Sequence, residues 1–414
     1  MFELIFKHLF SYLWALFSST LMNQATSQFI VENSEKDVRQ LALQAERYPL
    51  VDMPLAIRQI SGRQKIRTKL PSFYANESIQ YPAQLSLEQS SSESTALYKS
   101  SLCEGKELVD LTGGFGIDCF FMSAHFEQVT YVERHVELCT IAQHNFELLG
   151  TKHITVINAE SEKYLDEINT ADWIYIDPAR RSTAGKKVVL ISDCEPNVAQ
   201  LSTTLLAKAP NVMIKLSPMM DVSAAITELP RTCEVHIIAV ENECKEILLL
   251  LKSESSEPLK IKTINFGKKN SVQTFEFLPD DEQLAYSTFS PEIGKYLYEP
   301  NAAIMKSGAF KVIGNKFKLD KLHINTHLYT SNELEIDFPG RIFEVQKVWE
   351  NGKNEWKNEA KLLKKANLTT RNYPSSVDEL RKRLKLADGG NTYLFACTIG
   401  KDDKTMIACE KVEQ

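Results

Sequence analysis

The stretch 108–118 holds the residue types best suited to chemistry in this sequence. An apolar, strand-like run ends at the acid Asp110, a turn with three glycines follows, and the apolar segment 119–124 predicts a helix. Strand, glycine turn and helix in this order are typical of the first βαβ unit of a nucleotide-binding sheet. Glycine suits such a turn because, without a Cβ, the backbone can approach a ligand closely or adopt a positive φ.

The spacing within the turn discriminates between ligands. A dinucleotide site requires the pattern Gly-x-Gly-x-x-Gly, and Cys119 stands where its third glycine would be. The pattern that fits is acid-x-small-x-Gly-x-Gly, formed by Asp110, Thr112, Gly114 and Gly116. It resembles motif I of the class I S-adenosylmethionine (SAM) methyltransferases, with Thr112 in place of the usual first glycine. A purely structural glycine turn in another α/β protein remains the alternative.

The next elements continue the βαβ pattern. The run 128–132 predicts a second strand that ends at Glu133, about 20 residues past the turn, where a carboxylate can accept hydrogen bonds from a ribose diol. A helix over 136–149 and a strand over 154–157 follow. The resemblance implies SAM as cofactor, bound by residues at these strand tips: Asp110, Thr112, Gly113, Gly114, Gly116, Glu133, Asn158 and Glu160.

A fourth predicted strand, 171–176, ends at Asp177-Pro178-Ala179-Arg180-Arg181. This resembles the Asp/Asn-Pro-Pro-aromatic motif of methyltransferases that act on exocyclic amines, in which the acid accepts from the target NH₂. Here Ala179 replaces the second proline, and Arg180 replaces the aromatic residue that stacks on the base; a guanidinium plane can also stack. The expected catalytic residues are Asp177, Pro178, Arg180 and, in the fifth predicted strand 211–218, Lys215.

The Asp-Pro-x-Arg form also resembles RNA C5-uridine methyltransferases, which need a cysteine nucleophile after the fifth strand. That place holds Lys215-Leu216-Ser217-Pro218, so the C5 mechanism is disfavoured. Cys194 is the one cysteine expected near the site, and a structural role is the simpler interpretation.

Composition limits the class of protein. With 414 residues, 43% hydrophobic and 25% charged, the chain is expected to fold into two or three soluble domains. A net charge of −6 argues against an overall basic nucleic-acid binder but leaves local basic patches open. The eight cysteines include no Cys-x-x-Cys pair, which favours reduced thiols in the cytoplasm and no metal site.

The N-terminal part contains an apolar extension and then a mainly helical region, 23–95. The uninterrupted apolar run within residues 1–22 is well short of the ~20 residues that a spanning helix needs. We interpret residues 1–22 as an early start codon rather than an anchor, so a membrane partner is not expected unless this segment is a real anchor. Asn33 or Ser34 is predicted to cap a helix.

A run of five basic residues is either a solvated helix face or a phosphate contact: Arg58, Arg63, Lys65, Arg67 and Lys69. Gln89 and Thr95 are weaker candidates for the SAM pocket.

The C-terminal part loses the βαβ pattern. After the sheet domain, 96–265, a small α+β segment is expected at 280–338 and a second domain at 339–414, which ends in two strands around a turn. Within this second domain, 353–385 is predicted to form lysine-rich helices with ten basic and four acidic residues. A solvated surface is the usual explanation, yet this is the best electrostatic footprint for RNA in the chain.

From about Asn23 onward, the chain resembles bacterial SAM-dependent methyltransferases with a ferredoxin-like segment and a THUMP-like C-terminal domain. The matching stretches are 59–64, 111–116, 177–181, 215–219 and 338–341. The implied fold is α/β: a Rossmann-like methyltransferase sheet, an N-terminal helical region and small C-terminal α+β domains. THUMP-type domains guide enzymes to structured RNA, which makes RNA the implied partner, with Arg63, Arg181, Lys365 and Arg381 as expected substrate contacts.

The leading hypothesis is therefore a cytoplasmic enzyme that methylates a base nitrogen in RNA. Two alternatives stay open: a SAM-dependent methyltransferase with a protein or small-molecule substrate, and a SAM- or RNA-binding module without catalysis. The sequence does not predict the modified atom or the oligomeric state.

Overall fold

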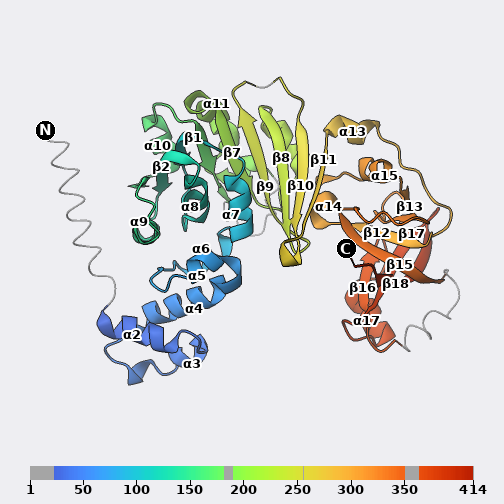
Figure 1. Cartoon of the computed structure of the whole chain (residues 1–414), viewed down its shortest axis with the longest axis horizontal. Coiled ribbons are helices and arrows are strands. Elements are labelled where there is room, and N and C mark those ends of the chain that lie inside the picture. The colour runs from blue at the N-terminus through green and yellow to red at the C-terminus, as the bar shows by residue number, and fades with distance from the viewer. Residues whose placement is uncertain (1–22, 181–189, 255, 350–362, 414) are drawn as a thin grey trace. The chain divides into compact units, whose positions relative to one another are not determined.

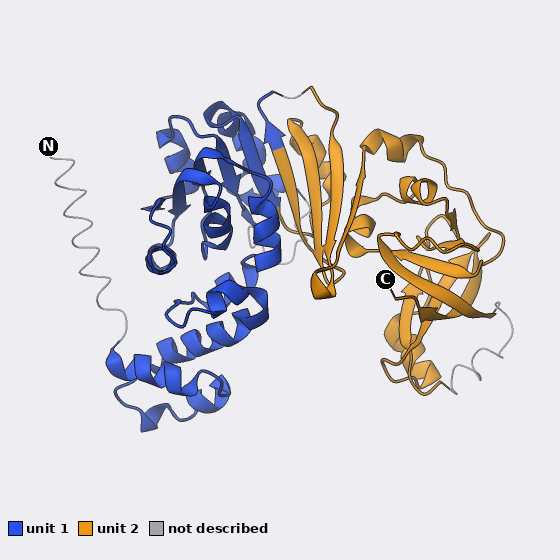
Figure 2. Cartoon of the chain, viewed as in Figure 1, with its two compact units in different colours: residues 1–215, 251–254 blue, residues 216–250, 255–414 orange. Residues whose placement is uncertain are grey.

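The computed structural model describes residues 23–180, 190–254, 256–349 and 363–413. The chain divides into two compact units (Figure 2). Unit 1 comprises residues 1–215 and 251–254, and unit 2 comprises residues 216–250 and 255–414. The expectations for residues 1–22 and for Arg181 lie outside the described residues.

Unit 1 begins with helices, as predicted for the N-terminal region (Figure 1). The predicted cap at Asn33 or Ser34 is wrong: Asn33 is the last residue of the first helix, and the Asp37 side chain accepts from the Arg39 N–H to cap the second. Asp37 is the cap instead, because its carboxylate accepts one of the backbone N–H groups that have no partner within the helix. The helices are α2 (Gln24–Asn33), α3 (Val38–Ala42), α4 (Met53–Lys69), α5 (Pro71–Tyr74), α6 (Gln84–Gln89) and α7 (Glu93–Ser100).

A parallel sheet follows in unit 1, with strands that keep nearly the predicted bounds. They are β1 (Gly105–Asp110), β2 (Phe126–Glu133), β3 (Ile154–Asn158), β4 (Trp173–Ile176) and β7 (Asn211–Leu216). Within unit 1 their spatial order is β7-β4-β1-β2-β3. The helices between them are α8 (Ile117–Ser123), α9 (Val136–Leu148), α10 (Ser161–Glu167) and α11 (Val198–Lys208).

The strand order reverses beside β1. From β1 the chain adds β2 and β3 on one side, then returns to add β4 and β7 on the other. In open α/β sheets, ligands bind outside the carboxyl ends of the strands at such a switch point. The acids at the ends of β1, β2 and β4 therefore meet at the edge where a ligand is expected.

After β4 the chain forms a small two-stranded ribbon. The strand β5 (Ala179–Arg180) pairs antiparallel with β6 (Cys194–Glu195), which follows the short 3₁₀ helix η2 (Ile191–Asp193). The sequence predicts a loop over the active site from residues 181–187 and 192–197. Residues 181–187 lie outside the described residues, and 192–197 include the end of η2 and strand β6.

The sequence predicts two strands at 235–240 and 246–251, joined in a hairpin. The structure has four strands in this part of the described chain. They are β8 (Thr232–Val240), β9 (Glu243–Lys252), β10 (Lys260–Phe266) and β11 (Val272–Phe277), after helix α12 (Val222–Glu228). Glu241 and Asn242 both have positive φ, which suits the two-residue turn of the predicted β8–β9 hairpin. Strand β10 runs parallel to β8 and antiparallel to β11.

A second, seven-stranded sheet occupies the rest of unit 2, in the order β13-β14-β12-β15-β18-β17-β16. The strands are β12 (Tyr296–Pro300), β13 (Asp320–Lys321), β14 (Tyr329–Ser331), β15 (Gly340–Trp349), β16 (Asn367–Arg371), β17 (Thr392–Ile399) and β18 (Asp403–Lys411). The helices are α13 (Pro279–Leu284), α14 (Ala302–Ser307), α15 (Val312–Lys316) and α17 (Val377–Leu384). In the described part of the chain, no helix is long and apolar enough to cross a membrane.

The prediction of lysine-rich helices over 353–385 is wrong in its described part. Residues 367–371 form strand β16, which pairs parallel with β17, and only 377–384 are helical. Tertiary pairing overrides local composition here, because Leu368 is buried in the core of the second sheet.

Candidate active site

The glycine turn after β1 is stabilised by hydrogen bonds among its own residues. The carboxylate of Asp110 accepts the N–H of Thr112 at 2.9 Å, and the Gly116 N–H donates to the Gly113 carbonyl at 2.8 Å. Gly114 has φ +56° and Gly116 has φ +82°, a conformation that favours glycine. The sequence therefore uses glycine here to fold the chain back at the tip of β1.

Packing distinguishes two of the glycines. A Cβ on Gly113 would lie 2.1 Å from the ring of Tyr131. Only glycine therefore allows the turn to pack on β2. A Cβ on Gly114 would meet nothing closer than the Thr112 carbonyl oxygen at 3.8 Å. The space beside Gly114 is open, as a turn that cradles a ligand requires.

Glu133, the acid at the end of β2, is tied to this turn. Its carboxylate accepts the N–H of Gly114 at 3.0 Å and the N–H of His135 at 2.8 Å. The Tyr131 hydroxyl donates to the Gly114 carbonyl oxygen at 2.6 Å. The predicted SAM residues of β1 and β2 thus form one hydrogen-bonded assembly.

The third strand tip contributes less than the sequence suggested. The Asn158 side chain donates to the carbonyl oxygens of Glu133 at 2.9 Å and Arg134 at 3.0 Å, which orders the tip of β2. Glu160 precedes α10, is exposed and makes no capping hydrogen bond. Of this pair, Glu160 has the side chain more open to a ligand.

Asp177 lies at the end of β4, next to the turn. Its N–H donates to the Thr112 hydroxyl at 2.6 Å, and its Oδ2 lies 2.5 Å from Nζ of Lys215. The Asp177 side chain is 36% exposed, whereas that of Lys215 is 10% exposed. Pro178, which follows, is buried. One carboxylate therefore reaches solvent at the switch point with an ammonium fixed behind it.

The sequence predicts Lys215 as a catalytic residue that holds a phosphate or a base. In the structure its ammonium lies between the carboxylates of Asp177 and Asp118, 3.5 Å from the latter. A buried ammonium in this position offsets the charge of both carboxylates, which favours a role toward these acids over contact with an external anion.

Asp118, in the first turn of α8, was missed by the sequence analysis. Its Oδ1 lies 3.2 Å from Nζ of Lys99, and its Oδ2 accepts from the hydroxyls of Tyr175 and Ser91, each at 2.8 Å. A signal was available, because Asp118 is the one charged residue in the apolar segment 117–123. Charged residues in apolar helices are buried only when they are paired.

The acids of the site differ in their ionisation. Burial raises the pKa of Asp110 well above its usual range; the Thr112 N–H opposes this, and the carboxylates of Asp118, Asp177 and Glu133 add to it. Burial also opposes ionisation of Asp118. There the ammonium groups of Lys99 and Lys215, with the hydrogen bonds of Tyr175 and Ser91, prevail and lower the pKa. Asp110 therefore lies in a region of excess negative charge from neighbouring carboxylates.

This arrangement fits SAM. Its methionine ammonium and sulfonium would offset the repulsion among the carboxylates around Asp110. The open space at Gly114 admits a ligand, and Glu133 lies where a ribose diol would need an acceptor.

Several predicted residues lie elsewhere or cannot be placed. The Arg63 guanidinium stacks on the Tyr74 ring at 4.3 Å and donates to the Asn76 carbonyl. Arg180 belongs to β5 by its backbone, and its side chain is not among those described. Gln89 is exposed, and the Thr95 hydroxyl, which is buried, donates to the Ser92 carbonyl. None of these contacts involves the glycine turn.

The basic side chains of α4 form ion pairs and hydrogen bonds within unit 1. Arg58 pairs with Glu137, and Lys69 donates to backbone carbonyls of residues 87 and 88. Lys65 pairs with Glu88 at 2.8 Å. These contacts join α4 to neighbouring helices and favour a structural role over phosphate binding.

Two expected substrate contacts lie in unit 2. Lys365 is exposed, beside the start of β16. Arg381, in α17, is half-buried and donates to Asp388 at 2.8 Å. An anion would find Lys365 more accessible than Arg381.

Comparison with known proteins covers nearly the whole chain. The crystal structure of a "putative methyltransferase" from Porphyromonas gingivalis W83 matches with a TM-score of 0.84 and 33% identity, over 94% of this chain and 98% of that one. An rRNA methylase from Streptococcus thermophilus matches with a TM-score of 0.31 and 13% identity, over 39% of this chain and 96% of that one. A score that low carries no information about activity. No curated protein matches the chain.

Two family profiles match unit 2. A ferredoxin-like domain matches residues 296–339, and a THUMP domain-like family matches residues 340–411. The expected ferredoxin-like and THUMP-like segments are therefore confirmed as families. In the structure, β12 of the first pairs with β15 of the second, so both share one sheet.

Proposed function

This chain belongs to the same methyltransferase family as the Porphyromonas gingivalis protein, and on that basis we propose that it methylates a base nitrogen in structured RNA. Family and fold make it a SAM-dependent methyltransferase with SAM as its cofactor, as motif I predicted. The substrate, the modified atom and the roles of individual residues are the proposal. All eight cysteines are free, which supports the cytoplasm as the place of action.

The observation that carries the choice of nitrogen is the geometry of Asp177. SAM supplies a methyl carbon bonded to sulfonium; an amine lone pair attacks it, the C–S electron pair stays on sulfur, and the nitrogen must lose a proton. A carboxylate at the end of β4 can accept a hydrogen bond from the amine, orient its lone pair and take the proton on to water. The ammonium of Lys215, 2.5 Å away, pairs with this carboxylate and fixes its orientation.

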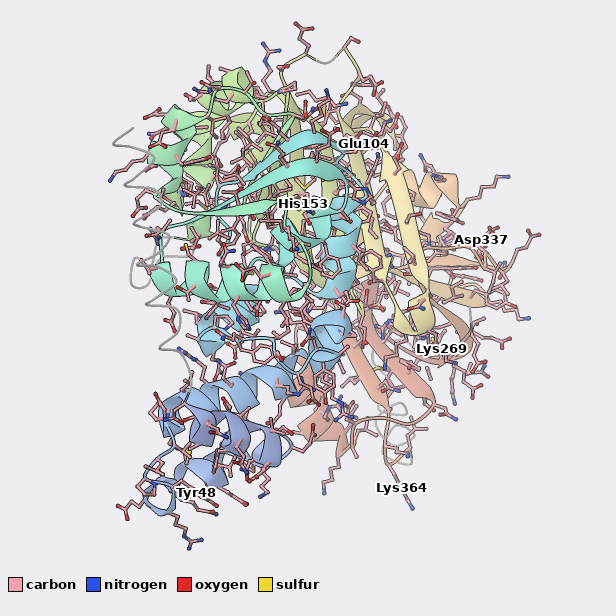
Figure 3. The ribbon with its side chains drawn as sticks, turned by 60° about the vertical axis from the view of Figure 1, so that its left-hand side comes forward. Tyr48, Glu104, His153, Lys269, Asp337 and Lys364 are labelled. Atoms are coloured by element: carbon pink, nitrogen blue, oxygen red, sulfur yellow. The ribbon has the colours of Figure 1, made fainter. Side chains whose placement is uncertain are left out.

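RNA is supported by unit 2. The THUMP-like segment carries exposed basic side chains around β16 and α17: Lys364, Lys365, Lys382, Arg383 and Lys385. Figure 3 shows Lys364 projecting away from the ribbon. Backbone phosphates bind such side chains without regard to sequence, which suits a domain that docks structured RNA.

The test is methyl transfer from radiolabelled SAM to RNA extracted from cells that lack this gene. We expect label in that RNA but not in RNA from cells that keep the gene, and Asp177→Ala should abolish transfer while it leaves SAM binding intact. Label in protein or small molecules instead would establish the first alternative. Unchanged transfer in Asp177→Ala would remove Asp177 from the chemistry, and no transfer by the wild type to any fraction would favour a binding module.

A matched pair of variants tests the RNA surface. Replacing Lys364, Lys365 and Lys382 by Gln should weaken RNA binding and reduce its salt dependence by about 2–3 in the log–log slope. The control replaces three exposed lysines of unit 1, Lys106, Lys152 and Lys163, and changes the net charge equally. Equal losses in both sets would mean that RNA responds to total charge and not to this surface.

A further inference from the structure

The described part of unit 1 contains two buried lysines, and the proposed methyl-transfer chemistry uses only one of them directly. Lys99, near the end of α7, has a fully buried side chain, and Lys215 in β7 is 10% exposed. A buried ammonium is costly unless it is paired, and an apolar residue of similar size would generally serve folding as well or better. Two such lysines beside one candidate active site call for a functional explanation.

The contacts form a chain of alternating charge. Nζ of Lys99 lies 3.2 Å from Asp118 Oδ1 and 3.1 Å from the Ser91 hydroxyl. Asp118 Oδ2 lies 3.5 Å from Nζ of Lys215, which in turn lies 2.5 Å from Asp177 Oδ2. The series Lys99, Asp118, Lys215, Asp177 has no net charge when all four are ionised, and its last member is by far the most exposed.

The position of Lys215 depends on the balance of this chain. Asp177 attracts its ammonium toward the solvent side, Asp118 attracts it toward the interior, and Lys99 offsets part of the charge of Asp118. Among the described residues, other titratable groups that interact with the chain include Tyr175, which donates to Asp118, and the neighbouring Asp110 and Cys119. A change of charge at Lys99 or Asp118 should therefore move Lys215 relative to Asp177 without touching the substrate.

We propose that Lys99 and Asp118 are positioning residues that hold Lys215 against Asp177, and so fix the Asp177 carboxylate as the acceptor of the substrate amine. This rests on the proposed function of Asp177. Neither residue was predicted from the sequence, and both lie behind the site rather than in it.

The kinetic test uses two single variants and their combination. Asp118→Asn leaves an excess of positive charge and Lys99→Met an excess of negative charge, so each should lower kcat for RNA methylation by about 100-fold through misplacement of Lys215. The KM for RNA and the Kd for SAM should stay within threefold of wild type. The double variant Lys99→Met/Asp118→Asn restores the balance and should recover at least tenfold over either single variant. If the pair only supports the fold, the double variant will be no better than the worse single one, and the proposal fails.

A second measurement does not need the substrate. Side-chain ¹⁵N-lysine NMR of the full chain should show slowly exchanging ammonium signals for Lys99 and Lys215, assigned with Lys99→Met and Lys215→Met. Asp118→Asn and Asp177→Asn should each shift or broaden the Lys215 signal. A Lys215 signal unchanged in Asp118→Asn overturns the proposal even if no RNA is methylated, whereas shifted signals without RNA methylation contradict the proposed function alone.

Tyr175→Phe covers the possibility that the charge variants do not fold. It removes one hydroxyl donor from Asp118 and leaves every charge in place. The Lys215 signal should move and kcat should fall about threefold with unchanged SAM affinity. No change in either quantity would contradict the proposed chain.

Discussion

Glu133 and Gly114 are joined by a hydrogen bond of 3.0 Å from the glycine N–H to the carboxylate, which ties the tip of β2 to the turn after β1. Gly114 combines this contact with a positive φ and open space on its Cβ side. A side chain there would project into the volume we assign to SAM.

Gly114→Val should therefore abolish SAM binding and leave the fold largely intact. Strain at positive φ costs about 1–2 kcal/mol, a shift in Tm of a few degrees, while filling the ligand volume should raise the Kd for SAM at least about 100-fold. Isothermal titration and thermal melting measure the two effects on the same protein.

Gly150→Val is the matched control for strain. Gly150 has φ +79° and nothing within 4 Å of an added Cβ, but it lies in the loop after α9. It should lose similar stability and keep SAM affinity. Equal loss of affinity in both variants would show that strain, and not occupation of a ligand site, explains the effect at Gly114.

The affinity for SAM should rise with pH because of Asp110. Burial and three neighbouring carboxylates raise its pKa, so at acidic pH the unliganded protein holds a proton there. A cationic ligand favours the ionised carboxylate, so binding releases that proton and log Kd should fall by up to about one unit per pH unit below the pKa. Titrations between pH 5 and 8 in buffers of different ionisation enthalpy measure this release. Asp110→Asn should bind more weakly and show a flatter pH dependence; affinity that falls with rising pH would contradict the assignment.

The sequence predicted the acids at the strand ends but not the Asp118–Lys99 pair behind them. Asp110, Glu133 and Asp177 follow strands, and the carboxyl ends of parallel strands share an edge, so their convergence follows from strand order alone. Asp118 and Lys99 lie on two helices, α8 and α7, and their contact depends on how those helices pack. No local pattern specifies that packing.

Dependence on non-local contacts also explains why β16 was wrongly predicted as part of a helix. Its local sequence lies in a lysine-rich stretch that favours a helix, and its strand is stabilised by parallel pairing with β17, more than twenty residues further along the chain. Leu368 shows the burial that results. The methyltransferase motifs, by contrast, are local and were read directly from the chain.

Cys194→Ala tests the rejection of the C5-uridine mechanism. Cys194 is 2% exposed in β6, which suits a small packed side chain and leaves no room for attack on a pyrimidine. The variant should keep methyl transfer within about twofold of wild type, since it removes only one buried sulfur. A covalent complex with RNA containing 5-fluorouridine, absent in Cys194→Ala, would restore the C5 mechanism.

Glu299 should be the main electrostatic support of the sheet in unit 2. It is 1% exposed at the end of β12 and accepts from Arg341 of β15 at 2.7 Å and from Arg371 of β16 at 2.7 and 3.2 Å. Glu299→Gln leaves two guanidinium groups without a counter-charge, which should cost about 3 kcal/mol. Hydrogen exchange of the β12 and β15 amides should then be roughly 100-fold faster, because 1.4 kcal/mol corresponds to a factor of ten.

The control Glu344→Gln removes a half-exposed pair with Lys295 at 3.6 Å and should cost less than about 1 kcal/mol. Similar exchange in both variants would mean that the two arginines stay solvated, and that apolar packing and the β12–β15 backbone pairing join the ferredoxin-like and THUMP-like segments without these ion pairs.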